Sequence, residues 1–142
     1  MANYKTKPFR VLIFVLTILY CLSFTSVFAS AEGSLYISAY GAYMSTGSSG
    51  NVLVTFQITG TGMMDEIGTT YIFLYENSSL IKTYTNTTTS GMLAYNKPAY
   101  ANSITYSGTV GKTYSALVVF KSGVGGGYDN RSMDTNSVVA KN

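Results

Sequence analysis

Apolar side chains alternate with mostly polar ones from Asn51 to Thr59, and this period of two most constrains what the chain can fold into. Successive side chains of a β-strand point to opposite faces, so the pattern predicts a half-buried strand. Its inner face consists of Val52, Val54, Phe56 and Ile58. Elsewhere no helical periodicity is sustained, and strand-like runs recur about every ten residues between Gly-, Ser-, Thr- and Asn-containing stretches. The sequence therefore predicts an all-β fold.

Seven strand segments are expected, at residues 34–44, 51–59, 71–75, 80–85, 103–107, 114–121 and 131–140. Gly60-Thr61-Gly62 is expected to end the second segment. Pro98 is expected to exclude an ordinary central strand from residues 92–101, because proline cannot donate a ladder hydrogen bond. On the sixth segment Tyr114, Ala116, Val118 and Phe120 share one face. These patterns predict one domain, a two-layer antiparallel β-sandwich of about seven strands.

The first 31 residues have the order of an export signal. A basic stretch with Lys5, Lys7 and Arg10 precedes an apolar run at residues 11–22, and Ala-Ser-Ala follows at residues 29–31. As a helix the apolar run is roughly 18 Å long, well short of the ~30 Å core of a bilayer. We expect a cleavable signal peptide at residues 1–31 and a secreted, extracellular domain at residues 32–142. Cleavage after Ala29, at Val27-Phe28-Ala29, and an uncleaved anchor are the alternatives.

Loss of this leader changes the charge and the redox chemistry of the chain. Nine Lys and Arg and six Asp and Glu give a formal net charge of +3, but Lys5, Lys7 and Arg10 leave with the leader. The remaining domain is formally neutral, which removes the electrostatic case for nucleic acid or an anionic membrane as a partner. The one cysteine, Cys21, also lies in the leader. The domain must therefore be stabilised by packing without a disulfide.

The segment from Ile104 to Phe120, with Gly-Lys-Thr-Tyr at residues 111–114, resembles the E-to-F corner of fibronectin type III and related immunoglobulin-like domains. In that corner a tyrosine hydroxyl bonds to the backbone a few residues upstream. The resemblance implies an immunoglobulin-like sandwich in which Tyr114 is the structural tyrosine of the corner.

The whole of residues 32–142 also resembles an uncharacterised group of small secreted proteins from Gram-positive bacteria of the Firmicutes type. The likeness lies in Val-Thr-Phe-Gln-Ile-Thr-Gly-Thr-Gly at residues 54–62, Met-Asp-Glu-Ile-Gly at 64–68, Tyr-Glu-Asn at 75–77 and Ser-Gly-Met at 90–92. This resemblance implies the compartment and the fold, and it implies no activity.

The residue types for common catalytic and metal sites are scarce. The sequence has no histidine, and no cysteine follows the leader, so a Ser-His-Asp or Cys-His site is excluded within one chain. Asp65 and Glu66 are expected in a surface turn, and a hydrolase that uses two carboxylates is the less favoured alternative. Asp129, Asn130 and Asp134 are expected in a Gly-rich loop whose spacing matches no EF-hand. No metal or cofactor is predicted.

An aromatic stripe is the feature that most suggests binding. In the third segment Tyr71, Phe73 and Tyr75 alternate with Ile72 and Leu74, so the aromatic side chains face outward if the aliphatic ones face the core. In the immunoglobulin-like order this segment pairs with the sixth, whose outward residues are Leu117 and Val119. Such a patch is typical of a surface for a partner or a glycan. The alternative is that other residues, such as Tyr95 and Tyr100, cover it as a second small core.

We therefore expect a secreted, non-enzymatic binding or interaction module whose partner is an extracellular protein or a cell-wall glycan. It would be held at the cell wall without a covalent bond, or released. Tyrosine suits this function because its side chain gives a large contact area at low entropic cost. A bacteriocin-like effector or inhibitor, from a different functional class, is the alternative to this interpretation.

Overall fold

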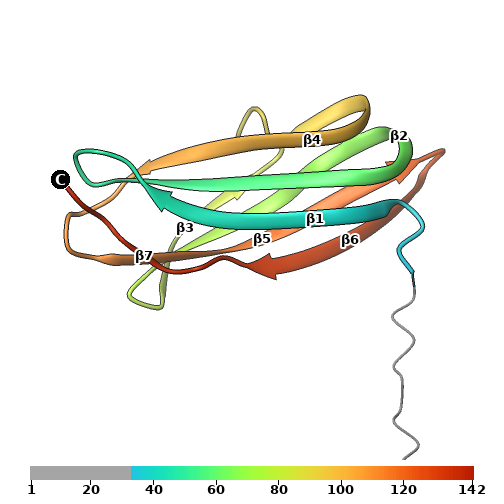
Figure 1. Cartoon of the computed structure of the whole chain (residues 1–142). Helices are drawn as coiled ribbons and strands as arrows, with labels where there is room; N and C mark the ends of the chain where they lie inside the picture. The colour runs from blue at the N-terminus through green and yellow to red at the C-terminus, as the bar shows by residue number, and fades with distance from the viewer. Residues whose placement is uncertain (1–32) are drawn as a thin grey trace, which may run out of the picture. The chain divides into compact units, whose positions relative to one another are not determined.

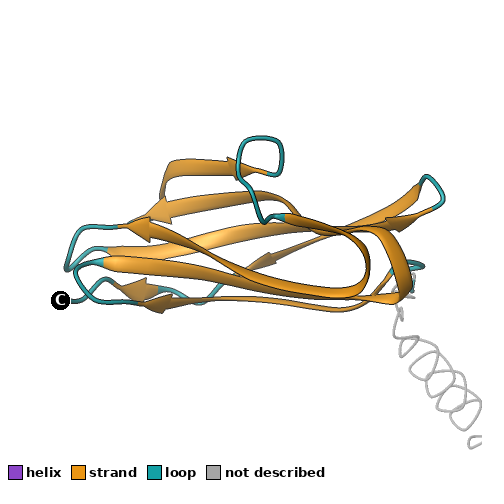
Figure 2. Ribbon diagram, turned by 90° about the horizontal axis from the view of Figure 1, so that it is seen from above, coloured by secondary structure: helices purple, strands orange, loops and turns teal. Residues whose placement is uncertain are grey.

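The computed structural model describes residues 33–142, which contain strands, turns and loops and no helix (Figure 2). The strands are β1 (Ile37–Thr46), β2 (Asn51–Glu76), β3 (Ser79–Thr85), β4 (Leu93–Ser107), β5 (Thr113–Val124), β6 (Gly127–Asp134) and β7 (Val138–Val139). The predicted signal peptide at residues 1–31 lies outside the described part of the chain. Within that part, no helix is long and apolar enough to span a bilayer.

All seven strands belong to one antiparallel sheet that folds over into two facing layers (Figure 1). The first half of β2 lies between β1 and β4, and its second half lies between β5 on one side and β3 and the start of β4 on the other. β6 and β7 pair with β5. β1, the first half of β2 and most of β4 therefore form one layer, and the second half of β2 with β3, β5, β6 and β7 forms the other. The all-β sandwich is confirmed, with the correction that its layers are parts of one continuous sheet.

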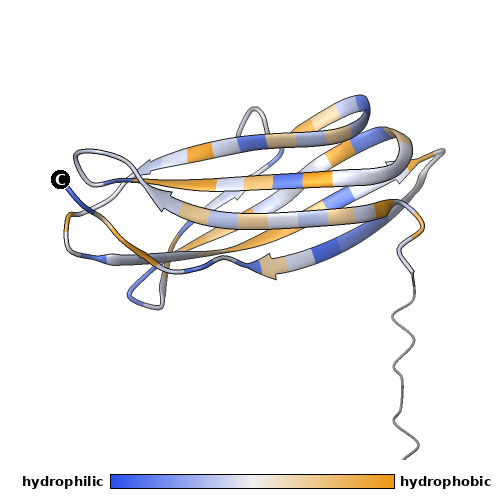
Figure 3. Ribbon diagram, in the orientation of Figure 1, coloured by the Kyte–Doolittle hydropathy of each residue, from blue (hydrophilic) through white to orange (hydrophobic). Residues whose placement is uncertain are grey.

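The core lies between the layers, on the faces that the period-two pattern predicts. Val52, Val54, Phe56 and Ile58 of β2 and Tyr114, Ala116, Val118 and Phe120 of β5 are all buried. Across the layers the rings of Tyr40 on β1 and Phe120 on β5 lie 5.2 Å apart. Along the strands, apolar positions alternate with polar ones (Figure 3). One contiguous core therefore holds the domain together.

The prediction that β2 ends at Gly60 was wrong, because the strand continues through the glycines into the second layer. Pairing with β4 moves from Thr59 opposite Ala99 to Met64 opposite Lys97, so residues 60–63 lie opposite Pro98 alone. These extra residues form a bulge, and bulges bend strands. Pro98 is tolerated at this irregularity because β4 has a neighbour on one side only. As a result β4 begins at Leu93 rather than at residue 103, and the pair Asp65–Glu66 lies on a strand rather than in a turn.

The prediction of a single final strand at residues 131–140 was also wrong, because two strands, β6 and β7, occupy this region. Gly125 and Gly126 both have positive φ and form a two-residue turn, so β6 starts at Gly127. Residues 135–137 then interrupt the strand before β7. Asp129, Asn130 and Asp134 consequently lie on β6 rather than in a Gly-rich loop.

Side chains close the gap between the outer edge of β1 and the last segment of the chain. The Asn136 amide accepts the Met44 N–H at 2.9 Å and donates to the Met44 carbonyl at 3.0 Å, as a neighbouring strand would. The Asp129 carboxylate accepts the Ser34 hydroxyl at 2.6 Å and the Tyr36 N–H at 3.0 Å. An edge closed in this way is protected against pairing with other chains.

We expect Asp129→Asn to destabilise the protein at neutral pH but not in acid. The hydrogen bonds from Ser34 and then from Tyr36 lower the pKa of the Asp129 carboxyl. A lowered pKa means that the contribution to stability is present above about pH 4 and is lost as the pH falls. Urea unfolding at pH 7 and pH 3 measures this difference, with Asp134→Asn, an exposed position on the same strand, as the control. Equal destabilisation at both pH values would contradict the electrostatic explanation.

Candidate functional site

The strand register brings the predicted outward residues together on one face of the second layer. Tyr71 pairs with Val119, and Phe73 pairs with Leu117. Ile72 and Leu74, the residues between the aromatic ones, are fully buried. We use the name aromatic stripe for Tyr71, Phe73, Tyr75, Leu117 and Val119. These five side chains therefore form one surface across β2 and β5.

The aromatic stripe is partly accessible from solvent. Tyr71 is 46% exposed, and the other four members are intermediate between buried and exposed. The rings of Tyr71 and Phe73 are nearly parallel, with an angle of 9° and centroids 5.8 Å apart. Because they stack on each other, the two rings hold a defined position before any ligand arrives.

Tyr95 and Tyr100 do not form a second core over the stripe. Tyr100 packs against the core residue Phe56, with ring centroids 6.1 Å apart, and its hydroxyl donates to the Gly91 carbonyl at 2.9 Å. Tyr95 is 60% exposed and pairs with Glu66, beyond the end of the stripe. These two tyrosines therefore have contacts away from the stripe.

Polar side chains on the neighbouring strands border the stripe. On β3, Thr83 lies opposite Phe73 and Thr85 lies opposite Tyr71. On β6, Ser132 lies opposite Val119 and Asp134 lies opposite Leu117. An apolar centre with a polar rim is the usual composition of a recognition surface.

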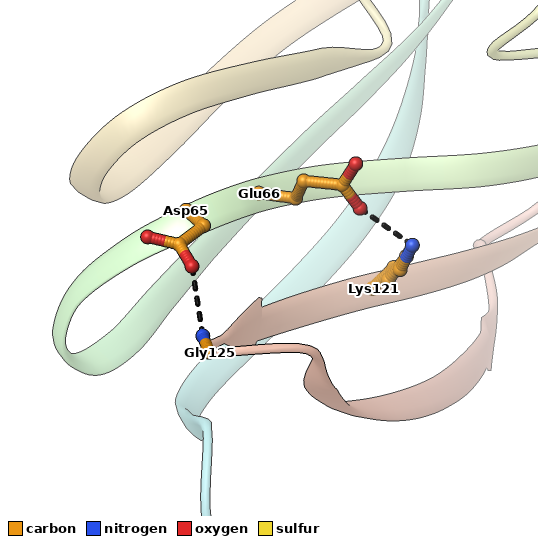
Figure 4. Close-up of polar contacts among 4 residues, drawn as sticks. All are labelled: Asp65, Glu66, Lys121 and Gly125. Carbon is orange, nitrogen blue, oxygen red and sulfur yellow. Dashed lines mark hydrogen bonds and ion pairs between the residues drawn. The ribbon is translucent and has the colours of Figure 1, made fainter.

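A shallow pocket of about 390 Å³ lies at the end of the same face, and it contains residues that the sequence did not single out as a site. The Nζ of Lys121 lies 2.5 Å from Oε2 of Glu66, and the Gly125 N–H donates to Oδ2 of Asp65 at 2.7 Å (Figure 4). The Lys121 ammonium also lies 5.0 Å from the centre of the Tyr128 ring. An aromatic ring and a close ion pair thus meet in one concave site.

The outer face of the first layer has a different character. Its central side chains are small or uncharged, and Gln57, Ala39 and Ala101 border a second shallow pocket of about 340 Å³. Thr55 and Ser103 share a hydrogen bond of 2.8 Å there. Tyr43, also on this face opposite Thr55, is 53% exposed. This face provides an internal comparison for the aromatic one.

Tyr114 has the geometry expected of a tyrosine corner. Its side chain is fully buried, and its hydroxyl accepts the Thr109 N–H at 2.8 Å. The same hydroxyl donates to Oε2 of Glu76 at 2.5 Å. Burial, together with the hydrogen bond to Glu76, raises the pKa of Tyr114. The residue joins the corner before β5 to the end of β2 and lies away from solvent.

Several carboxylates hold structural contacts. Glu66 forms an ion pair with Lys121, and Asp65 accepts a hydrogen bond from the backbone of the β5–β6 turn. Asp129 accepts a hydrogen bond from Ser34, and Glu76 accepts one from the Tyr114 hydroxyl. Among residues 33–142, no three His, Cys, Asp or Glu side chains are grouped so as to hold a metal ion.

A scan against protein-family models, a search of curated proteins and a search of solved structures found no match to this chain.

Proposed function

We propose that this protein is a secreted, non-enzymatic binding module that uses the aromatic stripe to contact a cell-wall glycan or another extracellular protein. The observation that carries the proposal is the stacked pair of exposed Tyr71 and partly buried Phe73 on a sheet face with a polar rim. The leader-like residues 1–31 support an extracellular location.

The physical basis is that contact with a ligand would bury aromatic surface that is already ordered. Aromatic side chains bury about 150–250 Å² each when fully covered. Tyrosine and tryptophan are enriched among residues whose truncation costs about 2 kcal/mol or more in binding. Because the Tyr71 and Phe73 rings already stack on each other, little side-chain entropy is lost on binding. The stripe therefore suits a moderate or tight interaction.

The double variant Tyr71→Ala, Phe73→Ala is expected to weaken binding at least about 30-fold, which corresponds to about 2 kcal/mol. The measurement is co-sedimentation of the exported protein with isolated cell walls and whole Gram-positive cells. The N-terminus of that protein, expected at Glu32, is sequenced first. Tyr43→Ala, an exposed tyrosine on the opposite face, is the matched control and should bind normally. Full binding by the double variant would remove the stripe from the proposal.

A further inference from the structure

We propose that the ligand of the stripe is an uncharged glycan chain and that the pocket beside Tyr128 is the subsite for one of its sugar rings. This inference rests on the proposed function, because it names the class of ligand that the same face would bind.

The pocket lies on the same outward face of the second layer as the stripe, beyond a register irregularity between Thr69 and Tyr71. Along β5 the outward residues are Leu117, Val119 and Lys121, and Lys121 pairs with Gly68 of β2. Gly68, which lies between the two regions, is buried and has no side chain. From Tyr75 to Glu66 the face is roughly 30 Å long at about 3.3 Å per residue. Two sites that follow one another along the strands of one face suit an extended polymer.

The pocket offers the two kinds of contact that a sugar ring needs. Tyr128, which is 58% exposed, supplies an aromatic surface for the apolar C–H face of the ring. Glu66 supplies acceptors and Lys121 supplies donors for neighbouring hydroxyl groups, and their side chains are 38% and 25% exposed. Hydrogen bonds to ionised groups are roughly twice as strong as neutral ones. Gly123, Gly126 and Gly127 line the remainder of the pocket, and a Cβ at Gly126 would meet nothing within 4 Å.

The balance of charge favours a neutral, hydroxylated ligand over the alternatives. Lys121 is neutralised by Glu66, and Asp65 adds a negative charge, so an anionic polymer would be repelled. An apolar protein surface would remove water from the ion pair without replacing its hydrogen bonds, which is unfavourable. Hydroxyl groups of a glycan replace that water and keep both charges hydrogen-bonded. The pocket therefore selects for an uncharged glycan.

The test uses the exported protein and the soluble tetramer of N-acetylglucosamine, a neutral glycan, with the glucose tetramer as a second probe. We expect at least one tetramer to bind in calorimetry and to release the protein from isolated cell walls. Glu66→Gln and Tyr128→Ala should each weaken this binding about tenfold or more, whereas Tyr128→Phe, which keeps the ring, should not. Lys112→Met, a change of an exposed cation outside the pocket, is the control. Binding should also be insensitive to 0.5 M salt, since the ligand is uncharged.

The outcomes separate this inference from the proposed function. Cell-wall binding that needs Tyr71 and Phe73 but is released by neither tetramer, or that is unchanged in Glu66→Gln and Tyr128→Ala, would overturn the inference and leave the binding module intact. Release by anionic teichoic acid, or by salt, would also overturn it, because the ligand would then carry charge. Normal wall binding by the Tyr71→Ala, Phe73→Ala variant would instead overturn the proposed function.

Discussion

Gly68→Ala is expected to destabilise the domain by about 2–5 kcal/mol. A Cβ at this position would lie 2.2 Å from the Met92 carbonyl oxygen and 2.9 Å from the Leu93 Cα, and both of these are backbone atoms that cannot rotate away. Gly68 also has a φ of +152°, which side-chain-bearing residues rarely adopt. Backbone strain and overpacking each cost about 1–3 kcal/mol. The glycine is required where β2 passes closest to the start of β4.

Gly62→Ala is the matched control, since it lies on the same strand and a Cβ there would meet nothing within 4 Å. Its effect should stay within about 1 kcal/mol, because alanine fits the extended backbone and restricts the unfolded chain. Urea unfolding of both variants, followed by circular dichroism, gives the two free energies of unfolding. Equal values for the two variants would contradict the close approach of β2 and β4 at Gly68.

The inner faces of the strands were predictable from the sequence because the pleat of a strand imposes the period of two locally. Val54 and Val118 are buried for this reason, and no knowledge of distant partners was needed. The continuity of β2 was not predictable in the same way. Whether Gly60 ends a strand or opens a bulge depends on the pairing with β4, whose Pro98 lies opposite the bulge and far along the chain. Local patterns hold no information about that partner.

The candidate site likewise has one part that local patterns predicted and one part that depends on the pairing of distant strands. The aromatic stripe followed from alternation within single strands together with one expected pairing, that of Tyr71 and Phe73 with β5. The pocket was missed because Glu66 and Lys121 are 55 residues apart, and only the register joins them. The one available signal was that Lys121 continues the outward series after Leu117 and Val119. That series was interpreted as ending with the last apolar residue.

Two tyrosine-to-phenylalanine changes are expected to alter stability in opposite directions, although each removes one buried oxygen. In Tyr114→Phe, the Thr109 N–H and the Glu76 carboxylate both lose their partner, and we expect a loss of about 2–3 kcal/mol. The Tyr84 hydroxyl is buried without a hydrogen-bond partner among the described residues. Tyr84→Phe removes an unsatisfied polar atom and should stabilise the protein by about 1 kcal/mol.

The pH dependence of these variants provides an independent check on the same argument. Burial is the largest of the causes that raise the pKa of Tyr84 and of Tyr114. A raised pKa means that the folded state holds the proton more tightly, so the stability contribution is complete below about pH 10 and is lost as the pH rises further. Urea midpoints between pH 8 and pH 11 should therefore fall less steeply for each phenylalanine variant than for the unmodified protein. Equal destabilisation by Tyr84→Phe and Tyr114→Phe at pH 8 would contradict this explanation. The two hydrogen bonds of the Tyr114 hydroxyl would then not distinguish it from the unpaired hydroxyl of Tyr84.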